Sequence, residues 1–349
     1  MNSYKIIKAD IQKNKEIIKN LLKKNVKDAS TKRYEWNYEK SEYGNAQCWL
    51  VKSNNSESFI GSAALFPRRI YLDSEPIYVA IAGDFAINKE HRAFGPALRL
   101  QKEIQKSIKK NKFKFIYGTP NKLSRKLFFR IGYQEIGKYK RYVKILKTEY
   151  VPKEYLPKSL RFKIPSKIID LIIKIISYEN RYKKKSEYYI ENLKYFDKRF
   201  DSFWKKVLNQ YNIIGERTSN FLNWRYIKSP SQNYKIFCIS NKKKEISGYI
   251  VYYFNDNICH IVDILYEKSE DILKTLLAEF IINVKTKNIG SIVVRYLGDS
   301  FLEDKLKKFN FFENKKEDAN VMIYGDFLSS KSDLLNGNNW HFLTGDSDV

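Results

Sequence analysis

The sequence predicts an α/β fold of the α+β kind, in which one domain occurs twice along the chain. Segments of similar sequence recur in the same order in both halves of the 349 residues. Within each half, strand-like runs rich in β-branched and aromatic residues alternate with amphipathic helix-like runs. We therefore expect each half to form a mixed, mostly antiparallel sheet flanked by helices.

Five pairs of segments carry the repeat. Residues 4–24 and 188–208 both have the pattern of a short strand followed by an amphipathic helix. "WNYEKS" at Trp36 and "WRYIKS" at Trp224 share the pattern W-x-Y-x-K-S and lie 188 residues apart. The other pairs are 58–66 with 245–253, 81–89 with 260–268, and 127–135 with 306–313. Each match is weak alone, but five in one order indicate two copies of one domain.

The repeat divides the chain into four predicted parts: a first domain at 1–145, a linker at 146–186, a second domain at 187–330 and a tail at 331–349. Pro152, Pro157 and Pro165 would interrupt regular structure in the linker. Its apolar run at 168–177 is too short to span a membrane. We expect a buried helix there, or else an interfacial one beside the Lys-rich "RYKKK" at 181–185.

The composition narrows the class of partner. The net charge of +26 is mostly Lys, which favours a solvated surface over a specific nucleic-acid site, because no Arg-rich block or zinc-finger spacing occurs. The charge still favours anionic ligands such as phosphates. Three widely spaced Cys give neither a disulfide framework nor a Cys-rich metal site. With no apolar core for a secretory signal and no spanning run, we expect a cytoplasmic monomer or dimer, with at most weak peripheral membrane association.

The segment 84–106 predicts a phosphate-binding loop. "GDFAIN" has strand character, "KEHRAFGPA" is turn-like, and "ALRLQKEIQKSIKK" is helix-like. The free N–H groups at the start of a helix form a cradle for an anion. Gly95 permits an unusual φ or close backbone approach, Pro96 suits a first helical turn, and Arg92 adds positive charge. The alternative is an ordinary strand–helix connection.

A second motif follows at the next strand, where Asn121, Ser124, Leu127 and Phe128 precede Gly132-Tyr133. With the loop Arg92-Ala93-Phe94-Gly95-Pro96-Ala97, this pair resembles the two coenzyme A motifs of the GNAT acyltransferase superfamily. "WRYIKSP" in the second half and the C-terminal "WHFLTGDSDV" further resemble tandem-GNAT proteins associated with surface-polysaccharide biosynthesis.

The resemblance implies two tandem GNAT domains and an acyl-CoA co-substrate, either acetyl-CoA or another short acyl-CoA, with no metal. It implies these coenzyme contacts: the backbone of Phe85, Ala86 and Ile87 to the pantetheine arm; amides of Arg92, Ala93, Phe94, Gly95, Pro96 and Ala97 to the pyrophosphate; and Asn121, Ser124 and Phe128 near the thiol. Such a site fits direct attack of an amine on the thioester, which needs no acyl-enzyme.

The sequence departs from the family where many members carry Tyr as the acid for the leaving thiolate. Phe128 stands there and has no proton to give, so the thiolate leaves unassisted or another residue serves. Tyr133 is a candidate, although a packing role is the other interpretation. For the general base we predict Asp84, whose alternative is a structural strand-end carboxylate.

The second copy lacks the loop. Its counterpart, "KSEDILKTLL", has no Gly, and its two acidic residues would repel a pyrophosphate, so we expect one coenzyme per chain. Trp224, Arg225 and Tyr226 are predicted to contact the acceptor, with the core as the alternative for both aromatic residues. In the tail, Asp346 and Asp348 are candidates to face the acceptor, unless this end is disordered.

These observations predict an acyl-CoA-dependent N-acyltransferase. By resemblance, its acceptor is the amine of an amino sugar, nucleotide-linked, and its acyl group is acetyl or a short 3-hydroxyacyl. Acylation of a protein or peptide amine is a second interpretation. A third is a non-catalytic GNAT module that binds anionic partners through its charge.

Overall fold

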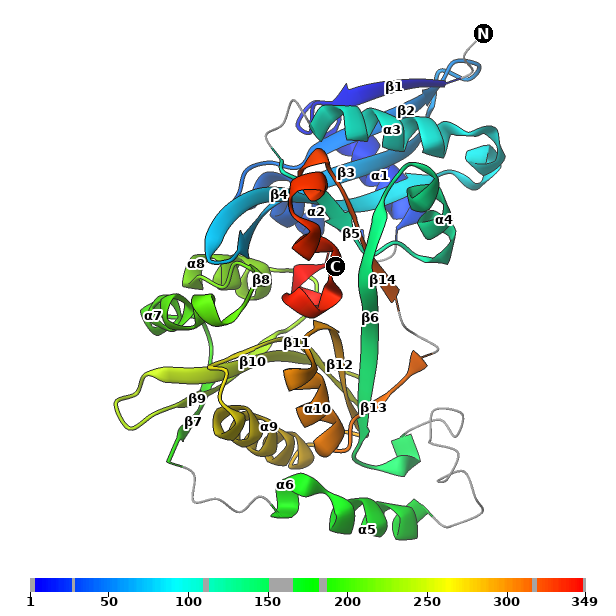
Figure 1. Cartoon of the computed structure of the whole chain (residues 1–349). Coiled ribbons are helices and arrows are strands. Elements are labelled where there is room, and N and C mark those ends of the chain that lie inside the picture. The colour runs from blue at the N-terminus through cyan, green and yellow to red at the C-terminus, as the bar shows by residue number, and fades with distance from the viewer. Residues whose placement is uncertain are drawn as a thin grey trace.

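The computed structural model describes residues 4–26, 29–108, 113–150, 166–181, 187–315 and 319–347. Figure 1 shows an upper and a lower half, with the C-terminal segment in red between them. The upper half contains β1 (Tyr4–Ala9), β2 (Gln47–Ser53), β3 (Phe59–Leu72), β4 (Glu75–Ile87), β5 (Ile116–Gly118) and β6 (Gln134–Ile145). Its helices are α1 (Lys15–Asn25), α2 (Thr31–Tyr34) with the π-turn η1 (Glu35–Glu39), the 3₁₀ turn η2 (Lys89–Phe94), α3 (Pro96–Ile108) and α4 (Lys122–Arg130).

The second half of the sequence, most of which forms the lower half of the molecule, repeats this order. It contains β7 (Tyr189–Leu193), α7 (Lys198–Val207), β8 (Ile213–Gly215), α8 (Ser219–Leu222) with the π-turn η7 (Asn223–Ile227), β9 (Lys235–Ser240), β10 (Ile246–Asn255), β11 (Ile258–Tyr266), α9 (Glu270–Lys285), β12 (Ser291–Gly298), α10 (Ser300–Lys308), β13 (Phe312–Glu313) and β14 (Ala319–Tyr324). The strand–helix pattern predicted for 4–24 and 188–208 is therefore confirmed.

The strands of the described residues form one hydrogen-bonded network. Its main path is β13-β6-β14-β5-β4-β3-β8-β15-β12-β11-β10-β9-β7, where β15 is Trp340–Leu343, and β2 attaches β1 to β3. Most pairs are antiparallel, and the parallel ones are β4–β5, β11–β12 and β8–β15. The mixed, mostly antiparallel sheet predicted from the sequence is confirmed.

Two strands cross between the halves. β6 runs from the upper half down to β12, where Tyr142 lies opposite Val294. β14, from the second half of the sequence, inserts between β5 and β6, with Met322 opposite Gly118. The predicted domain boundaries stay predictions, but the upper core crosses the one at 330, since Val321 and Phe342 belong to it.

The repeated W-x-Y motifs meet at the centre of the molecule. Trp36 of η1 and Trp224 of η7 stack with ring centroids 5.0 Å apart. Each indole also donates a hydrogen bond to the other residue's carbonyl, at 2.8 Å from Trp36 and 3.4 Å from Trp224. The two copies thus contact through equivalent residues, as expected around a pseudo-two-fold axis.

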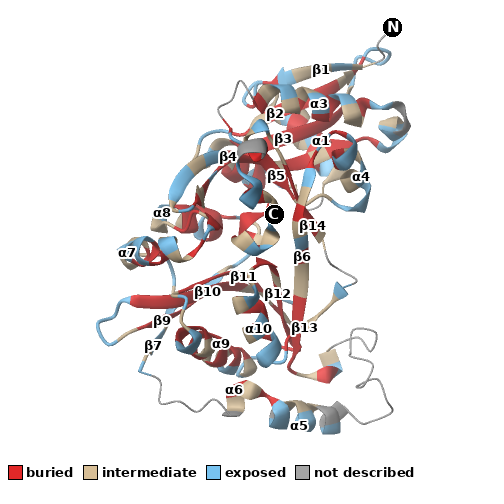
Figure 2. Cartoon of the chain, in the orientation of Figure 1, coloured by how far each residue is buried: buried red, intermediate tan, exposed pale blue. Residues whose placement is uncertain are grey.

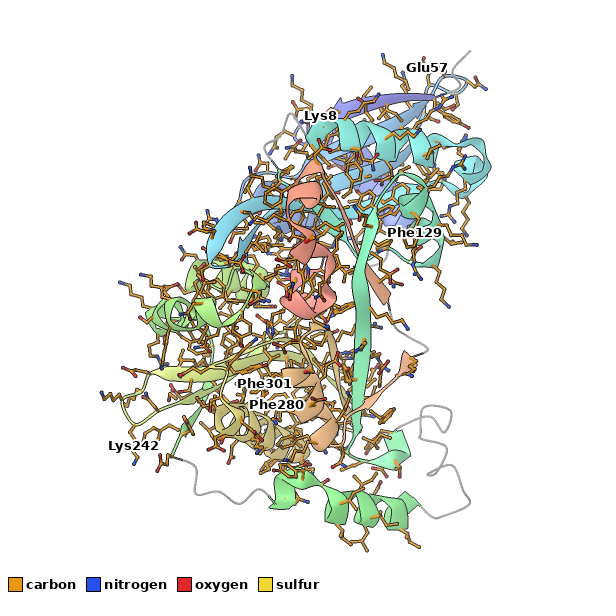
Figure 3. All side chains as sticks on the ribbon, in the orientation of Figure 1. Lys8, Glu57, Phe129, Lys242, Phe280 and Phe301 are labelled. Carbon is orange, nitrogen blue, oxygen red and sulfur yellow. The ribbon has the colours of Figure 1, made fainter. Side chains whose placement is uncertain are left out.

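Helices cover the lower sheet, whose strands are largely buried (Figure 2). Phe280 of α9 is fully buried and packs edge-to-face on Tyr252 and Phe237 (Figure 3).

The linker helix α5 (Ser166–Ile176) corrects one expectation. Its apolar residues Ile168, Leu171, Ile172, Ile175 and Ile176 are 40–60 % exposed, so the buried interpretation is wrong. The helix is held by its polar side, since Asp170 accepts hydrogen bonds from the backbone and hydroxyl of Thr148 at 2.8 Å.

Candidate functional site

The site begins where two parallel strands of the upper half separate. β4 and β5 pair only at Ala80–Ile116 and Ile81–Tyr117. Beyond Ala82, the edge of β4 that faces β5 has no strand partner among the described residues. Apart from the carbonyl of Ile87, which accepts a hydrogen bond from Arg92, the N–H and C=O groups of this edge are therefore available to an extended ligand, as at any open sheet edge.

A bulge lies on β4 at this opening. The register against β3 shifts between Ser62 and Ala64, and Asp84 has φ +48°, in the left-handed region. A non-glycine residue adopts this conformation at a cost, and bulges often re-aim groups beside functional sites. The three residues predicted to contact the pantetheine arm, Phe85, Ala86 and Ile87, follow this bulge on the unpaired edge.

The predicted phosphate loop has the geometry that its residues suggest. Gly95 has φ +78°, and α3 begins at Pro96. A Cβ added at Gly95 would meet no atom within 4 Å, so space lies open above the loop. Arg92 donates from Nε to the carbonyl of Ile87 at 3.0 Å, which ties the loop to the end of β4. The side chains of Ala93 and Phe94 are not among those described. Ala97 packs against a second apolar cluster of the upper half, which includes Leu100 and Phe128.

Asn121 starts the second predicted element. Its side-chain oxygen accepts from the amides of Leu123 and Ser124 at 3.1 and 3.0 Å, which makes it the N-cap of α4. Asn121 and Ser124 both line a cavity, together with Phe128 one turn further along α4.

Phe128 leaves no hydroxyl at the position where the sequence resemblance predicts the acid for the leaving thiolate. Its ring is buried and stacks on Tyr133 at 4.5 Å. Tyr133 is itself buried outside the cavity lining, and burial raises the pKa of its hydroxyl. The packing interpretation of Tyr133 is therefore favoured over a role as acid. Phe129 lies on the outer side of α4 and is 46 % exposed (Figure 3).

The cavity has a volume of about 960 Å³ and lies between the halves. Its upper wall contains residues of α1 to α2, β4 and α4. Its lower wall contains Arg225, Tyr226, Tyr234 and Tyr253, with the 230–232 turn and part of the tail. Among the described lining residues the cations are Lys23, Arg33 and Arg225, and Asp84 is the carboxylate. This balance favours an anionic or phosphorylated ligand.

Asp84 is at the centre of a buried ion pair. Arg33 contacts it through two hydrogen bonds of 2.9 and 3.0 Å, and the hydroxyl of Tyr38 donates to it at 2.8 Å. Burial and the neighbouring Asp84 charge raise the pKa of Tyr38. The lower half has an equivalent pair, Asp263 with Arg217. Asp84 differs in lining the cavity, so the base role stays a prediction beside the structural one.

Of the three residues of the second copy that were predicted to contact the acceptor, two line the cavity and one does not. Trp224 is 1 % exposed and does not line the cavity, which corrects the acceptor-binding prediction in favour of the core. Tyr226 and Arg225 do line it. The guanidinium of Arg225 donates to the carbonyls of Gly345 and Ser347 at 2.9 and 3.2 Å, so it also holds the tail.

The tail packs back between the halves rather than extending into solvent. Asp346 forms a bidentate ion pair with Arg217 at 2.7 and 2.8 Å and is buried outside the cavity lining. This corrects its predicted role toward an acceptor. Thr344 and Gly345 line the cavity instead. Asp348 lies outside the described residues.

Several lining residues escaped the sequence-based reasoning. Arg33 lies three residues before the first W-x-Y motif, and this spacing could have drawn attention to it. Lys23 looks like any surface residue of an amphipathic helix. Tyr234 and Tyr253 lie on a turn and a strand where aromatic residues are common, so no local signal marks them.

No protein-family model matches the sequence, and neither does any curated protein. Solved structures do match. A structure from Enterococcus faecalis V583, described as a probable N-acyltransferase, has a TM-score of 0.66 at 16% identity, over 94% of this chain and 74% of that one. A GCN5-related N-acetyltransferase from Anabaena variabilis ATCC 29413 has 0.61 at 13%, over 92% and 72%. N-myristoyltransferase from Saccharomyces cerevisiae, with bound myristoyl-CoA, has 0.60 at 14%, over 93% and 79%.

These likenesses establish that the chain has the GNAT fold along nearly its whole length. None of the described helices is long and apolar enough to cross a bilayer. The part of the chain that the structure describes also holds no group of three or more His, Cys, Asp or Glu arranged to share a metal ion.

Proposed function

We propose that the protein is an N-acyltransferase that moves an acyl group from coenzyme A to an amine, with one coenzyme site per chain. The observation that carries this proposal is the opening between β4 and β5, with its bulge at Asp84 and the Gly95 loop at its end. One of the structures with the same fold holds myristoyl-CoA, which supports an acyl-CoA co-substrate here.

The residues at this opening fit coenzyme A. The free edge at 85–87 would pair with the amides of the pantetheine arm, and the N–H groups at the start of α3 would hold the pyrophosphate. Asn121, Ser124 and Phe128 line the cavity where the thiol would end. The amine would then approach from the lower wall, and backbone N–H groups near the bulge would stabilise the oxyanion.

For the acceptor we propose an amino sugar that is nucleotide-linked, as the family resemblance implies. The lower wall supports this, because Tyr226, Tyr234 and Tyr253 offer aromatic faces for a sugar or base and Arg225 offers a cation. We propose acetyl or a short 3-hydroxyacyl group as the donor. The location proposed is the cytoplasm, where three free, buried cysteines are expected to remain reduced.

The test is release of free thiol from a panel of acyl-CoAs with amino-sugar nucleotides. Gly95→Trp fills the open space above the loop and should abolish release and coenzyme A binding. Gly95→Ala is the matched control, since it adds the strain of a positive φ with far less bulk and should keep most of the binding. Full activity in Gly95→Trp would show the coenzyme assignment to be wrong.

The same panel should include peptides with free amines. Protein or peptide acylation remains the second candidate, because N-myristoyltransferase shares this fold. Thiol release with peptides and none with amino-sugar nucleotides would favour it. The absence of coenzyme A binding, combined with steeply salt-dependent binding to nucleic acid, would favour a non-catalytic module.

A further inference from the structure

Two arginines lie side by side on the lower part of the sheet, outside the lining of the cavity. Arg141 of β6 and Arg295 of β12 are direct partners in an antiparallel pair. Residues in register on neighbouring strands point to the same face of a sheet. Like charges in this position repel, so an anion across both guanidinium groups would stabilise them. Each guanidinium has five N–H donors and can add a phosphate oxygen to its contacts within the protein.

An aromatic row leads from the cavity toward this pair. Tyr226 and Tyr234 contact edge-to-face at 5.2 Å, and Tyr234 contacts Tyr253 in the same way at 5.7 Å. Tyr253 then stacks flat on His260, with ring centroids 4.8 Å apart and planes 9° from parallel. The three tyrosines line the cavity, and His260 lies next to the last of them.

The sheet register joins the row to the arginines. His260 on β11 is opposite Val293 on β12, and Arg295 follows two residues later on the same face. On the other side, Arg295 lies over the ring of Tyr139 at 5.8 Å, and the hydroxyl of Tyr139 donates to Thr344 at 2.8 Å. Thr344 lines the cavity. Arg295 therefore has Tyr139, which contacts this cavity residue, on one side and His260 on the other.

The charges agree with this geometry. Burial and, to a smaller extent, the positive charges of Arg141 and Arg295 together lower the pKa of His260 to about 4. The imidazole is therefore neutral near pH 7 and can stack on Tyr253 without adding a third charge.

We propose that Arg141 and Arg295 bind the phosphate of the acceptor, while the row from Tyr226 to His260 contacts its ring. This inference rests on the proposed function, because only an acyltransferase has an acceptor. It assigns the acceptor a chemical class: a sugar that carries a phosphate or diphosphate. A nucleotide sugar and a sugar phosphate share that chemistry.

Binding of two probes tests the proposal without any turnover. Calorimetric titrations would use uridine diphosphate and glucosamine 1-phosphate, with uridine as the probe that lacks phosphate. The variants are Arg141→Gln and Arg295→Gln. The matched control is Lys138→Gln, which removes one positive charge from an exposed residue of β6 on the opposite face. Coenzyme A binding is measured in parallel for each variant.

Each arginine variant should weaken binding of at least one phosphate probe by about tenfold or more, with Lys138→Gln unchanged. Binding of coenzyme A should be unaffected. The probe that responds identifies whether the phosphate belongs to a nucleotide or to a sugar phosphate. The proposal is overturned if neither phosphate probe binds better than uridine, or if all three variants bind the probes equally. If the unmodified protein does not bind coenzyme A, the proposed function itself is refuted.

Discussion

Asp84 combines an unusual backbone with a buried ion pair. Replacing it by Asn leaves Arg33 buried with less compensation, so we expect Asp84→Asn to lose roughly 3–5 kcal/mol of unfolding free energy. If Asp84 is also the base, turnover per folded molecule falls as well. Calorimetry and a thiol-release profile below the melting temperature measure the two effects separately.

Asp263→Asn is the matched control for this variant. It breaks the equivalent buried pair with Arg217, but its carboxylate does not line the cavity. We expect it to destabilise the fold while turnover per folded molecule is kept. Equal turnover in both variants across pH 6 to 8 would remove Asp84 from consideration as the base.

One buried histidine, His341, and one half-buried histidine, His260, make stability depend on pH. Burial lowers the pKa of both His260 and His341 to about 4. The unfolded chain, with histidine pKa values near 6.5, binds more protons than the folded one between about pH 6.5 and 4. The stabilising contribution is therefore full above pH 6.5 and is lost as the pH falls through this window, at about 1.4 kcal/mol per unit of pKa difference.

Chemical unfolding at pH 7.0 and 5.0 measures this loss. His341 is held in place by Nε2, which donates to the carbonyl of Ile264 at 2.8 Å, so Gln can replace the bond. His341→Gln should reduce the difference in stability between the two pH values. His91→Asn changes a less buried ring and serves as the control. An unchanged difference in His341→Gln would contradict the prediction.

Individual residues were predictable from sequence where backbone geometry demands a particular residue type. Gly95 is the residue type that favours a left-handed backbone, and Pro96 favours the first turn of a helix. Asn121 is a residue type that favours the N-cap position. The burial of Trp224 was less accessible, because an aromatic residue suits a sugar site and a core equally well. Trp224 belongs to the core because it stacks on the ring of Trp36, which is 188 positions away in the sequence.

At the scale of elements, the exposed face of α5 is the least explained. The apolar residues of this face recur at the spacing of one helical stripe, and the linker and its surroundings at 147–187 carry 11 Lys and Arg against 5 Asp and Glu. We therefore expect this face to associate weakly with an anionic membrane surface. The double variant Leu171→Gln with Ile175→Gln should no longer float with phosphatidylglycerol vesicles. Because both side chains are exposed, stability should change by less than about 1 kcal/mol.

Ile282→Gln, an exposed apolar residue of α9, controls for a general loss of surface hydrophobicity. Vesicle binding that persists in the α5 variant, or that is absent from the unmodified protein, would contradict the expectation. The helix itself was predictable from its apolar run, but its orientation was not. The side facing the protein is fixed by Asp170 and Thr148, which are 22 positions apart.

Across the whole molecule, the two tryptophans couple the halves. We expect Trp36→Ala to cost about 3–5 kcal/mol of unfolding free energy, because a buried ring and a hydrogen bond are lost. In a double-mutant cycle, Trp224→Ala should cost less in the Trp36→Ala background than alone. Denaturant unfolding of the four proteins gives the coupling energy, and additive costs would show that the stack contributes little.

The repeat and the type of sheet were predictable at this scale, since both depend on local periodicity. The crossing of β6 and β14 was not. β14 is a short run of buried apolar residues whether it pairs beside β13 or between β5 and β6, and only the completed sheet selects between these positions.

The crossing also sets an order of events during synthesis. β5 leaves the ribosome about 200 residues before the strand that completes its edge, since β5 ends at Gly118 and β14 begins at Ala319. At roughly 5–20 residues per second, that edge stays unpaired on the nascent chain for about 10 to 40 s. An open edge of this kind recruits other chains, so the upper half depends on a late-arriving strand both to mature and to avoid aggregation.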